Sequence, residues 1–233
     1  MTQLTLDLRH PAAFGRADFM VSAGNAAALA AVERWPNWPQ RVLVLHGPAG
    51  SGKTHLAHIW RERAAARIVP GGALAEAGSG DWREDGAPAL AVDDAEEAPE
   101  EALLHLYNAC RERGVGLLLT CRAAPSSWPI ALPDLASRLR AAWAVGIEPP
   151  DDDLLGAVLV KHFADRQLVV RPEVVRYLLR RMERSLAAAA DVAAALDRLA
   201  LSRGVPVTVR LARALLGDGG SQASEPPNDL GVA

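Results

Sequence analysis

A glycine-rich stretch early in the chain constrains the fold more than any other feature. It consists of Gly47, Pro48, Ala49, Gly50, Ser51, Gly52, Lys53 and Thr54. An apolar run precedes it at 42–45, and a helical pattern follows at 55–60. Glycines let the backbone wrap around an anion with its N–H groups inward, the lysine reaches the β- and γ-phosphates, and the threonine hydroxyl can ligate Mg²⁺. Strand, loop and helix in this order form a P-loop, so we expect the chain to bind ADP or ATP with Mg²⁺.

Composition and charge narrow the class of protein. The 233 residues are 50% hydrophobic and 23% charged, which is typical of a soluble protein of one or two domains. The net charge is -3, so the total charge gives no sign of a protein that coats nucleic acid. The two cysteines, Cys110 and Cys121, have neither disulfide nor metal-site spacing, so we expect buried free thiols. No apolar run approaches the length of a membrane span. These features favour a cytoplasmic protein without a membrane anchor.

Apolar runs alternate with helical patterns in the first two thirds of the chain. Strong strands are predicted at 42–45, 90–94 and 115–120, with weaker ones at 66–69 and 144–147. Helices are predicted at 26–35, capped by Asn25, and at 100–113, ended by Gly114. Buried strands separated by helices indicate an α/β domain with a parallel sheet covered on both faces.

The composition changes at Pro149 and Pro150, after which the pattern is helical throughout. Helices are predicted at 151–166, 172–183, 187–202 and 208–216. We expect an N-terminal segment at 1–16, which could be an edge strand or an extended peptide that docks elsewhere, followed by an α/β nucleotide-binding domain at 17–150. A small all-helical domain is expected at 151–217, and a disordered Gly/Ser/Pro-rich tail at 218–233.

Polar residues follow two of the predicted strands. Asp93 and Asp94 end the predicted strand at 90–94, where open α/β sheets place their ligands. Asp93 suits the role of holding Mg²⁺ through water, and Asp94 that of orienting the attacking water; the alternative is an acidic pair that merely begins a loop. Thr120 ends the next strong strand and could place its hydroxyl near the γ-phosphate.

Two arginines, Arg138 and Arg140, lie just before the last predicted strand. An arginine there, at the edge of a subunit, could reach the γ-phosphate of a neighbouring molecule and stabilise the charge of the transition state. The alternative is an arginine on a helix face in water, which spacing alone favours.

Several of these motifs together resemble one family. The P-loop with His55-Leu56 after it, the strand that ends at Asp93-Asp94, and 132–139 followed by 147–150 are similar to the AAA+ module of the replication initiators of the DnaA type. The resemblance extends to about Gly217. It implies a P-loop AAA+ module in which a helical lid follows the α/β domain, and we expect no DNA-binding domain after this lid.

The N-terminal peptide narrows the resemblance to the Hda family of DnaA-homologous regulators. The peptide carries Gln3, Leu4, Leu6 and Leu8, a Gln-x-x-Leu-x-Leu pattern. In that family such a peptide docks on the DNA polymerase sliding clamp (the β subunit), and the AAA+ module stimulates hydrolysis of the ATP bound to DnaA. The resemblance thus implies a negative regulator of replication initiation, with clamp and DnaA as partners and Arg138 as an arginine finger that acts in trans.

The sequence departs from this family at one place. The lid arginine that contacts nucleotide in family members is replaced by Ala187, which favours weak hydrolysis by the chain itself and leaves ADP or ATP open as its ligand. Two other functions stay open: a self-sufficient AAA+ ATPase of the helicase-loader type, and an accessory factor that tethers DnaA to DNA. If the chain is a negative regulator of this kind, we expect no direct specific binding to DNA. The sequence does not decide whether the protein forms homo-oligomers.

Overall fold

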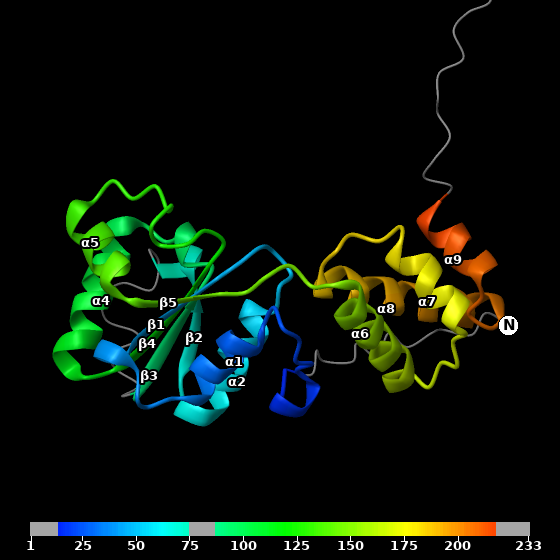
Figure 1. Cartoon of the computed structure of the whole chain (residues 1–233), viewed down its shortest axis with the longest axis horizontal. Helices are drawn as coiled ribbons and strands as arrows, with labels where there is room; N and C mark the ends of the chain where they lie inside the picture. The colour runs from blue at the N-terminus through cyan, green and yellow to red at the C-terminus, as the bar shows by residue number, and fades with distance from the viewer. Residues whose placement is uncertain (1–13, 75–86, 218–233) are drawn as a thin grey trace, which may run out of the picture. The chain divides into compact units, whose positions relative to one another are not determined.

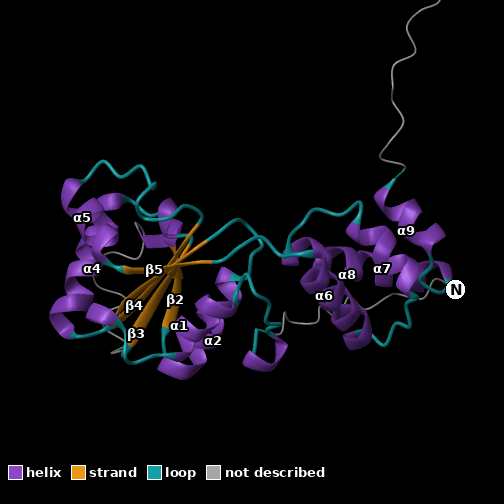
Figure 2. Ribbon diagram, viewed as in Figure 1, coloured by secondary structure: helices purple, strands orange, loops and turns teal. Residues whose placement is uncertain are grey.

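A parallel sheet forms the centre of the first part of the protein. The computed structural model describes residues 14–74 and 87–217, and within them the sheet has five strands in the order β2-β3-β4-β1-β5 (Figures 1 and 2). The strands are β1 (Val42–His46), β2 (Arg67–Pro70), β3 (Ala89–Asp93), β4 (Gly116–Cys121) and β5 (Trp143–Gly146). Every pairing is parallel. The predicted α/β fold with a parallel sheet is confirmed.

Helices cover both faces of this sheet. They are α1 (Ala26–Glu33), α2 (Lys53–Ala64), α4 (Glu100–Arg113) and α5 (Pro133–Ala141), with 3₁₀ turns at Arg16–Asp18, Pro39–Arg41, Gly71–Leu74 and Ala95–Glu97. Because side chains alternate along a strand, Leu43 and Leu45 of β1 pack in one core with α1 and α2, and Val42 and Val44 pack in another with α4 and α5. The four buried positions of β1 are therefore apolar without alternation, as in sheets covered on both faces.

The second part of the described chain is all helical. Its helices are α6 (Asp152–Asp165), α7 (Pro172–Leu179), α8 (Leu186–Arg203) and α9 (Val209–Leu216). They share one core, which includes Phe163, Leu178 and Leu196. The chain divides into two compact units between Leu154 and Leu155, within the first turn of α6.

Two details of the helices differ from prediction. Asn25 does not cap α1 through its side chain: its Oδ1 accepts from the N–H of Ser22 at 2.8 Å and its Nδ2 donates to the carbonyl of Met20 at 3.0 Å. The buried amide therefore fixes the turn that leads into the helix, a competing use typical of Asn. Helix α7 ends at Leu179 rather than at 183, since the chain turns there and buries Met182 against Leu178.

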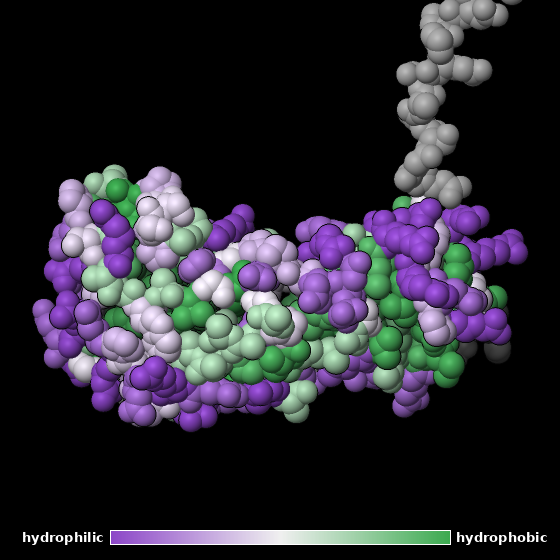
Figure 3. All heavy atoms as spheres, in the orientation of Figure 1, coloured by the Kyte–Doolittle hydropathy of each residue, from purple (hydrophilic) through white to green (hydrophobic). Residues whose placement is uncertain are grey.

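The described surface mixes polar and apolar side chains. On the face that Figure 3 shows, hydrophilic residues border the apolar ones in both units. The large apolar side chains most exposed to solvent are Val21, Val160, Val169, Leu201 and Val205. Among the helices of the described ranges, none has the length and apolar character needed to cross a bilayer.

The start of α8 depends on one buried hydroxyl. Ser185 Oγ accepts from the N–H of Ala188 at 3.0 Å, which satisfies one of the unpaired donors of the first turn. Replacing Ser185 by Ala should lower the free energy of unfolding of the helical unit by about 1 kcal/mol. Hydrogen exchange of the α8 amides measures this effect.

Ser202→Ala is the matched control, because Ser202 lies exposed near the other end of α8 and its hydroxyl donates only to the carbonyl of Leu199. We expect its effect to stay within about 0.5 kcal/mol. Equal losses of protection in the two variants would contradict a capping role for Ser185.

Candidate nucleotide-binding site

The loop between β1 and α2 lies at the carboxyl edge of the sheet, where parallel α/β folds bind their ligands. Helix α2 begins at Lys53, and Gly52 before it has φ of 101°, a left-handed conformation that favours glycine. Gly47 is required for a different reason: a Cβ there would lie 2.5 Å from the carbonyl oxygen of Ile147. The predicted P-loop sequence thus forms a tight loop at the start of a helix.

The side chains of the loop are arranged around its own carbonyl groups. Lys53 is buried, and its Nζ donates to the carbonyls of Gly47 at 2.8 Å and Pro48 at 2.9 Å. Burial lowers the pKa of Lys53, while the negative charges of Asp94, Glu96 and Asp93 oppose that shift. An ammonium group that bonds only neutral carbonyls can transfer these bonds to a phosphate, which is a stronger acceptor.

Ser51 leaves a second polar group in the loop without a partner. Its Oγ is buried, and no hydrogen-bond partner lies within reach in the described part of the chain. Buried polar atoms are normally paired, so an orphan of this kind is the expected mark of a ligand site. The unpaired hydroxyl of Ser51 and the left-handed turn at Gly52 are therefore consistent with a loop that binds a phosphate group.

Asp93 is the centre of a hydrogen-bond network beside the loop. Its Oδ2 accepts from Thr54 Oγ1 at 2.9 Å, and its Oδ1 accepts from Thr120 Oγ1 at 2.6 Å. The structure thus brings together three predicted site residues from α2, β3 and β4. A threonine hydroxyl beside a carboxylate is the donor set that Mg²⁺ uses with substrate phosphates, so Thr54 and Asp93 fit the predicted metal site.

Thr120 makes two hydrogen bonds beside the P-loop, to Asp93 and Asp94, and its predicted place near the γ-phosphate stays a prediction. Its hydroxyl is completely buried, donates its proton to Asp93 and accepts from the backbone N–H of Asp94 at 2.9 Å. While these bonds are in place the hydroxyl has no proton left for a phosphate. In this structure Thr120 therefore orients the carboxylate of Asp93.

Asp94 lies directly after β3 in a left-handed conformation, with φ of 50° and ψ of 56°. For a residue other than glycine this conformation is uncommon and carries a cost in free energy. The bond from its N–H to Thr120 and the bond from the N–H of Glu97 to its carbonyl hold it there. Its charge acts on Lys53, so its carboxylate lies in the field of the site. The predicted role in orienting water stays a prediction.

Glu96 is a member of the site that the sequence analysis missed. Its Oε1 accepts from the backbone N–H of Arg122 at 3.0 Å and lies 3.6 Å from Arg122 Nε, while its Oε2 is buried and has no hydrogen-bond partner among residues 14–74 and 87–217. Its charge also opposes the lowered pKa of Lys53. The available signal was the acidic run after β3, but the run alone does not say which carboxylate faces the loop.

The two cysteines are buried free thiols, as predicted. Cys121 ends β4, and its Sγ donates to the carbonyl of Ala123 at 3.1 Å. Burial raises the pKa of each thiol to about 12, so both stay protonated at neutral pH.

Arg138 lies in the last turn of α5, and its contacts in the described chain are with residues outside the Asp93 network. Its Nη2 donates to Asp134 Oδ2 at 3.0 Å, and its guanidinium lies over the ring of Tyr107. Arg140, two residues on, donates from Nε to the carbonyl of Ala136 in its own helix. Nothing in the described part of the chain pairs Arg138 with the P-loop, and its predicted action on another molecule stays a prediction.

Two other features of the sequence analysis concern the N-terminal peptide and Ala187. The residues of the clamp-binding peptide lie outside the described residues; they are Gln3, Leu4, Leu6 and Leu8. Ala187, the position at which the family resemblance implies a nucleotide-binding arginine, is exposed in the first turn of α8.

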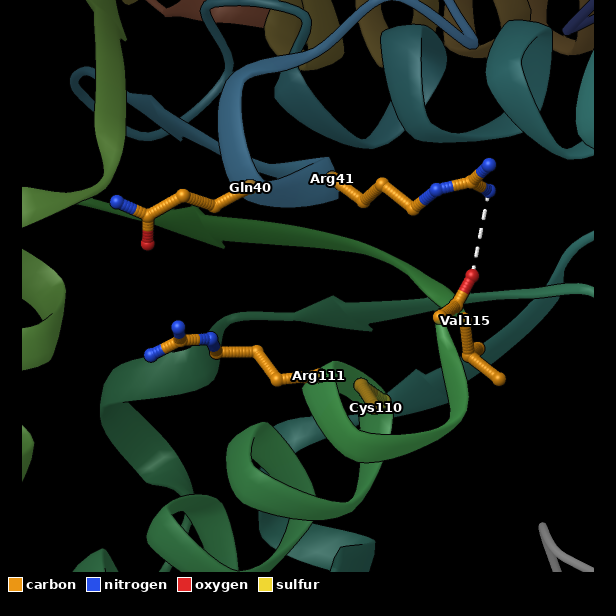
Figure 4. Close-up of a pocket in the computed structure, with 6 residues that line it drawn as sticks. Gln40, Arg41, Cys110, Arg111 and Val115 are labelled. Atoms are coloured by element: carbon orange, nitrogen blue, oxygen red, sulfur yellow. Dashed lines mark hydrogen bonds between the residues drawn. The ribbon is translucent and has the colours of Figure 1, made fainter.

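A pocket of about 290 Å³ lies at the opposite, amino edge of the sheet, between the turn before β1 and the end of α4 (Figure 4). Gln40, Arg41 and Arg111 contribute its polar side chains. Arg41 Nη1 donates to the carbonyl of Gly114, the dashed bond in Figure 4, and so satisfies the C-terminus of α4. Figure 4 shows the guanidinium groups of Arg41 and Arg111 pointing apart, so they do not converge on one ligand.

The chain resembles known replication initiator proteins in sequence. No family model matches the chain. The sequence is 28% identical to the chromosomal replication initiator protein DnaA of Thermomicrobium roseum, in an alignment 240 positions long that covers 88% of this chain and 50% of that protein. The chain thus spans about half the length of the curated relative that it matches.

Solved structures agree on the fold. Domain III of the Thermotoga maritima replication initiation protein DnaA superposes with a TM-score of 0.75 at 18% identity, covering 87% of this chain and 95% of that one. A replication initiator DnaA bound to AMPPCP and single-stranded DNA gives a TM-score of 0.66 at 20% identity, covering 77% and 63%. The chain is DnaA-like, and the predicted P-loop AAA+ fold with a helical C-terminal part is confirmed.

The network at Asp93 makes a testable prediction about metal-dependent binding. Thr120→Val removes the hydroxyl that donates to Asp93 and accepts from Asp94, and so leaves buried polar groups unsatisfied. We expect the affinity for ADP with Mg²⁺ to fall about tenfold, while binding with EDTA changes little. Isothermal titration calorimetry with and without Mg²⁺ measures both.

Thr120→Ser keeps the hydroxyl and is the control, expected to bind Mg²⁺-ADP nearly as the parent protein does. Undiminished magnesium-dependent affinity in Thr120→Val would show that Thr120 does not orient the carboxylate of Asp93.

Proposed function

We propose that this protein is a nucleotide-binding negative regulator of chromosomal replication initiation, which binds the DNA polymerase sliding clamp and stimulates hydrolysis of the ATP held by DnaA. The observation that carries the proposal is Arg138, a partly exposed arginine on the last turn of α5 in a DnaA-like AAA+ fold. The pattern of Gln3, Leu6 and Leu8 supports the clamp as the second partner.

The stimulation follows from the chemistry of a guanidinium group. The γ-phosphoryl group develops charge on its oxygens as it leaves ATP, and an arginine supplied by a second molecule stabilises that charge. Arg138 has a side chain that is 28% exposed, so part of its planar donor fork is open to a partner. DnaA would hold ATP and water, and this chain would supply the arginine.

The chain's own nucleotide has a structural role in this proposal. The backbone N–H groups of the P-loop and Lys53 would hold the phosphates of ADP or ATP, and Thr54 and Asp93 would hold Mg²⁺. The bound metal would screen the repulsion between phosphates and the carboxylates of Asp93 and Asp94. Transfer of the Lys53 bonds from the carbonyls of Gly47 and Pro48 to phosphate would tie the loop to the ligand. Nucleotide would then stabilise the shape in which α5 is presented.

A second candidate is an ATPase that works alone, as a helicase loader does. The connected network of Thr54, Asp93 and Thr120 favours it, since a site that only stores nucleotide has less need of an oriented carboxylate. Turnover of ATP without DnaA, abolished by Lys53→Ala, would support this function in place of the first.

The third function, tethering DnaA to DNA, has less support in this chain. A relative of similar fold was solved with single-stranded DNA, so DNA binding is worth measuring directly. Affinity for DNA that falls steeply with salt would favour the tethering function, because each phosphate contact releases a counterion.

Removing the proposed finger is the first test of regulation. Arg138→Ala should reduce the stimulated hydrolysis of DnaA-bound ATP about a thousandfold, since an arginine finger contributes that much to phosphoryl transfer. The measurement is the rate of ADP formation from preformed DnaA–ATP with DNA-loaded clamp present.

The matched control is Arg140→Ala, because Arg140 lies on the same helix and its Nε bonds only the carbonyl of Ala136. We expect this variant to stimulate DnaA normally. If the Arg138→Ala protein were as active as the parent, the proposed function would be wrong.

The clamp peptide is tested by binding. A triple substitution of Gln3, Leu6 and Leu8 by Ala should abolish binding to the immobilised clamp, because the glutamine and leucines supply the anchoring contacts of such peptides. Surface plasmon resonance measures the affinity, with Arg138→Ala as a control that keeps it. Retained clamp binding by the triple variant would rule out this peptide as the docking site.

A further inference from the structure

The guanidinium group of Arg138 is held by residues of two helices. Asp134, one turn earlier on α5, accepts from its Nη2 at 3.0 Å, and the ring of Tyr107 on α4 lies beneath it, 6.0 Å from Cζ to the ring centroid. Tyr107 is itself 1% exposed and fixed in the core between the sheet and α4. The ring is therefore a rigid support, whereas Asp134 is an exposed partner.

The donors of Arg138 divide into occupied and open groups. A guanidinium has five N–H donors in one plane. Nε is buried and has no partner among the described residues, and Nη2 gives one bond to Asp134. Since burial keeps Nε from solvent, the donors left for a phosphate are on the Nη nitrogens. Asp134 thus holds one donor of Nη2, and the remaining Nη donors can be presented to a phosphate.

We propose that Asp134 and Tyr107 are positioning residues, which hold the guanidinium of Arg138 in the orientation that meets the γ-phosphate of a partner's nucleotide. This inference rests on the proposed function, because it specifies how the finger of that function is presented. Neither residue touches the phosphate. They act by restricting the rotamers of a side chain that otherwise loses considerable entropy on binding.

The orientation of the Asp134–Arg138 pair agrees with this role. An acidic residue four positions before a basic one is the stronger arrangement on a helix, and each charge lies near the helix end that favours it. Such an exposed pair is weak, so Asp134 can orient the arginine without withholding it from a phosphate. The ring of Tyr107 adds a cation–π contact with partial burial, which is the stronger of the two restraints.

The first measurement observes the arginine directly. In the parent protein, the Nε–Hε signal of Arg138, assigned by its loss in Arg138→Lys, should be shifted by the ring current of Tyr107. Tyr107→Leu should move that signal, and Tyr107→Phe, which keeps the ring, should leave it nearly unchanged. This readout needs neither DnaA nor clamp. A signal that is the same in Tyr107→Leu as in the parent overturns the inference.

The second measurement separates positioning from binding. At saturating protein, we expect stimulated hydrolysis of DnaA-bound ATP to fall about twofold in Asp134→Ala, about fivefold in Tyr107→Leu and about tenfold in the double variant. The protein concentration for half-maximal stimulation should not change. Tyr107→Phe should restore the rate, and Asp134→Asn, which still accepts a hydrogen bond, should restore part of it.

Controls distinguish the possible failures. Thermal unfolding and ADP affinity show whether Tyr107→Leu keeps its fold, and Asp134→Ala carries the test alone if it does not, because Asp134 is on the surface. If Arg138→Ala abolishes stimulation while Asp134→Ala and the double variant match the parent, the positioning role is wrong and the proposed function stands. If Arg138→Ala itself retains stimulation, both fail.

Discussion

The carboxylate of Asp93 is the interaction on which the site depends. It joins the start of α2, through Thr54, to the end of β4, through Thr120. The strand order explains why: β4 lies between β3 and the P-loop strand β1, so its last residues face both. A single buried hydroxyl, that of Thr120, then holds the carboxylate of Asp93 and the strained backbone of Asp94 together.

The segment after β5 constrains the other side of the P-loop. The N–H of Ile147 donates to the carbonyl of His46 at 2.7 Å, and the Ile147 carbonyl approaches Gly47 so closely that a Cβ would overlap it. The N–H of Glu148 continues the contact to the carbonyl of Gly24. The first residue of the loop is therefore packed between its own strand and the segment after β5. The requirement for glycine here comes from packing and not from a left-handed backbone.

Local patterns were sufficient to predict the elements and the P-loop, because periodicity and glycine spacing are properties of neighbouring residues. Contacts between distant residues were not predictable in this way. Tyr107 and Arg138 meet only because α4 and α5 pack side by side on one face of the sheet. The buried amide of Asn25 and the inward carboxylate of Glu96 likewise depend on which way a turn faces. Position before the last strand made Arg138 and Arg140 candidates, the resemblance to a family favoured Arg138, and the structure supplied the surroundings of Arg138.

The electrostatics of the two sites support a division of roles. Lys53 lies among the charges of Asp93, Asp94 and Glu96, so the P-loop holds its cation within an acidic surrounding. Arg138 has its contacts elsewhere, with an acidic residue of its own helix and an aromatic ring. A cation whose described partners all lie on α4 and α5 has no bond to give up at the P-loop of the same chain. In the proposed function, its open donors would meet a phosphate that another molecule brings to α5, as those of an arginine finger in trans do.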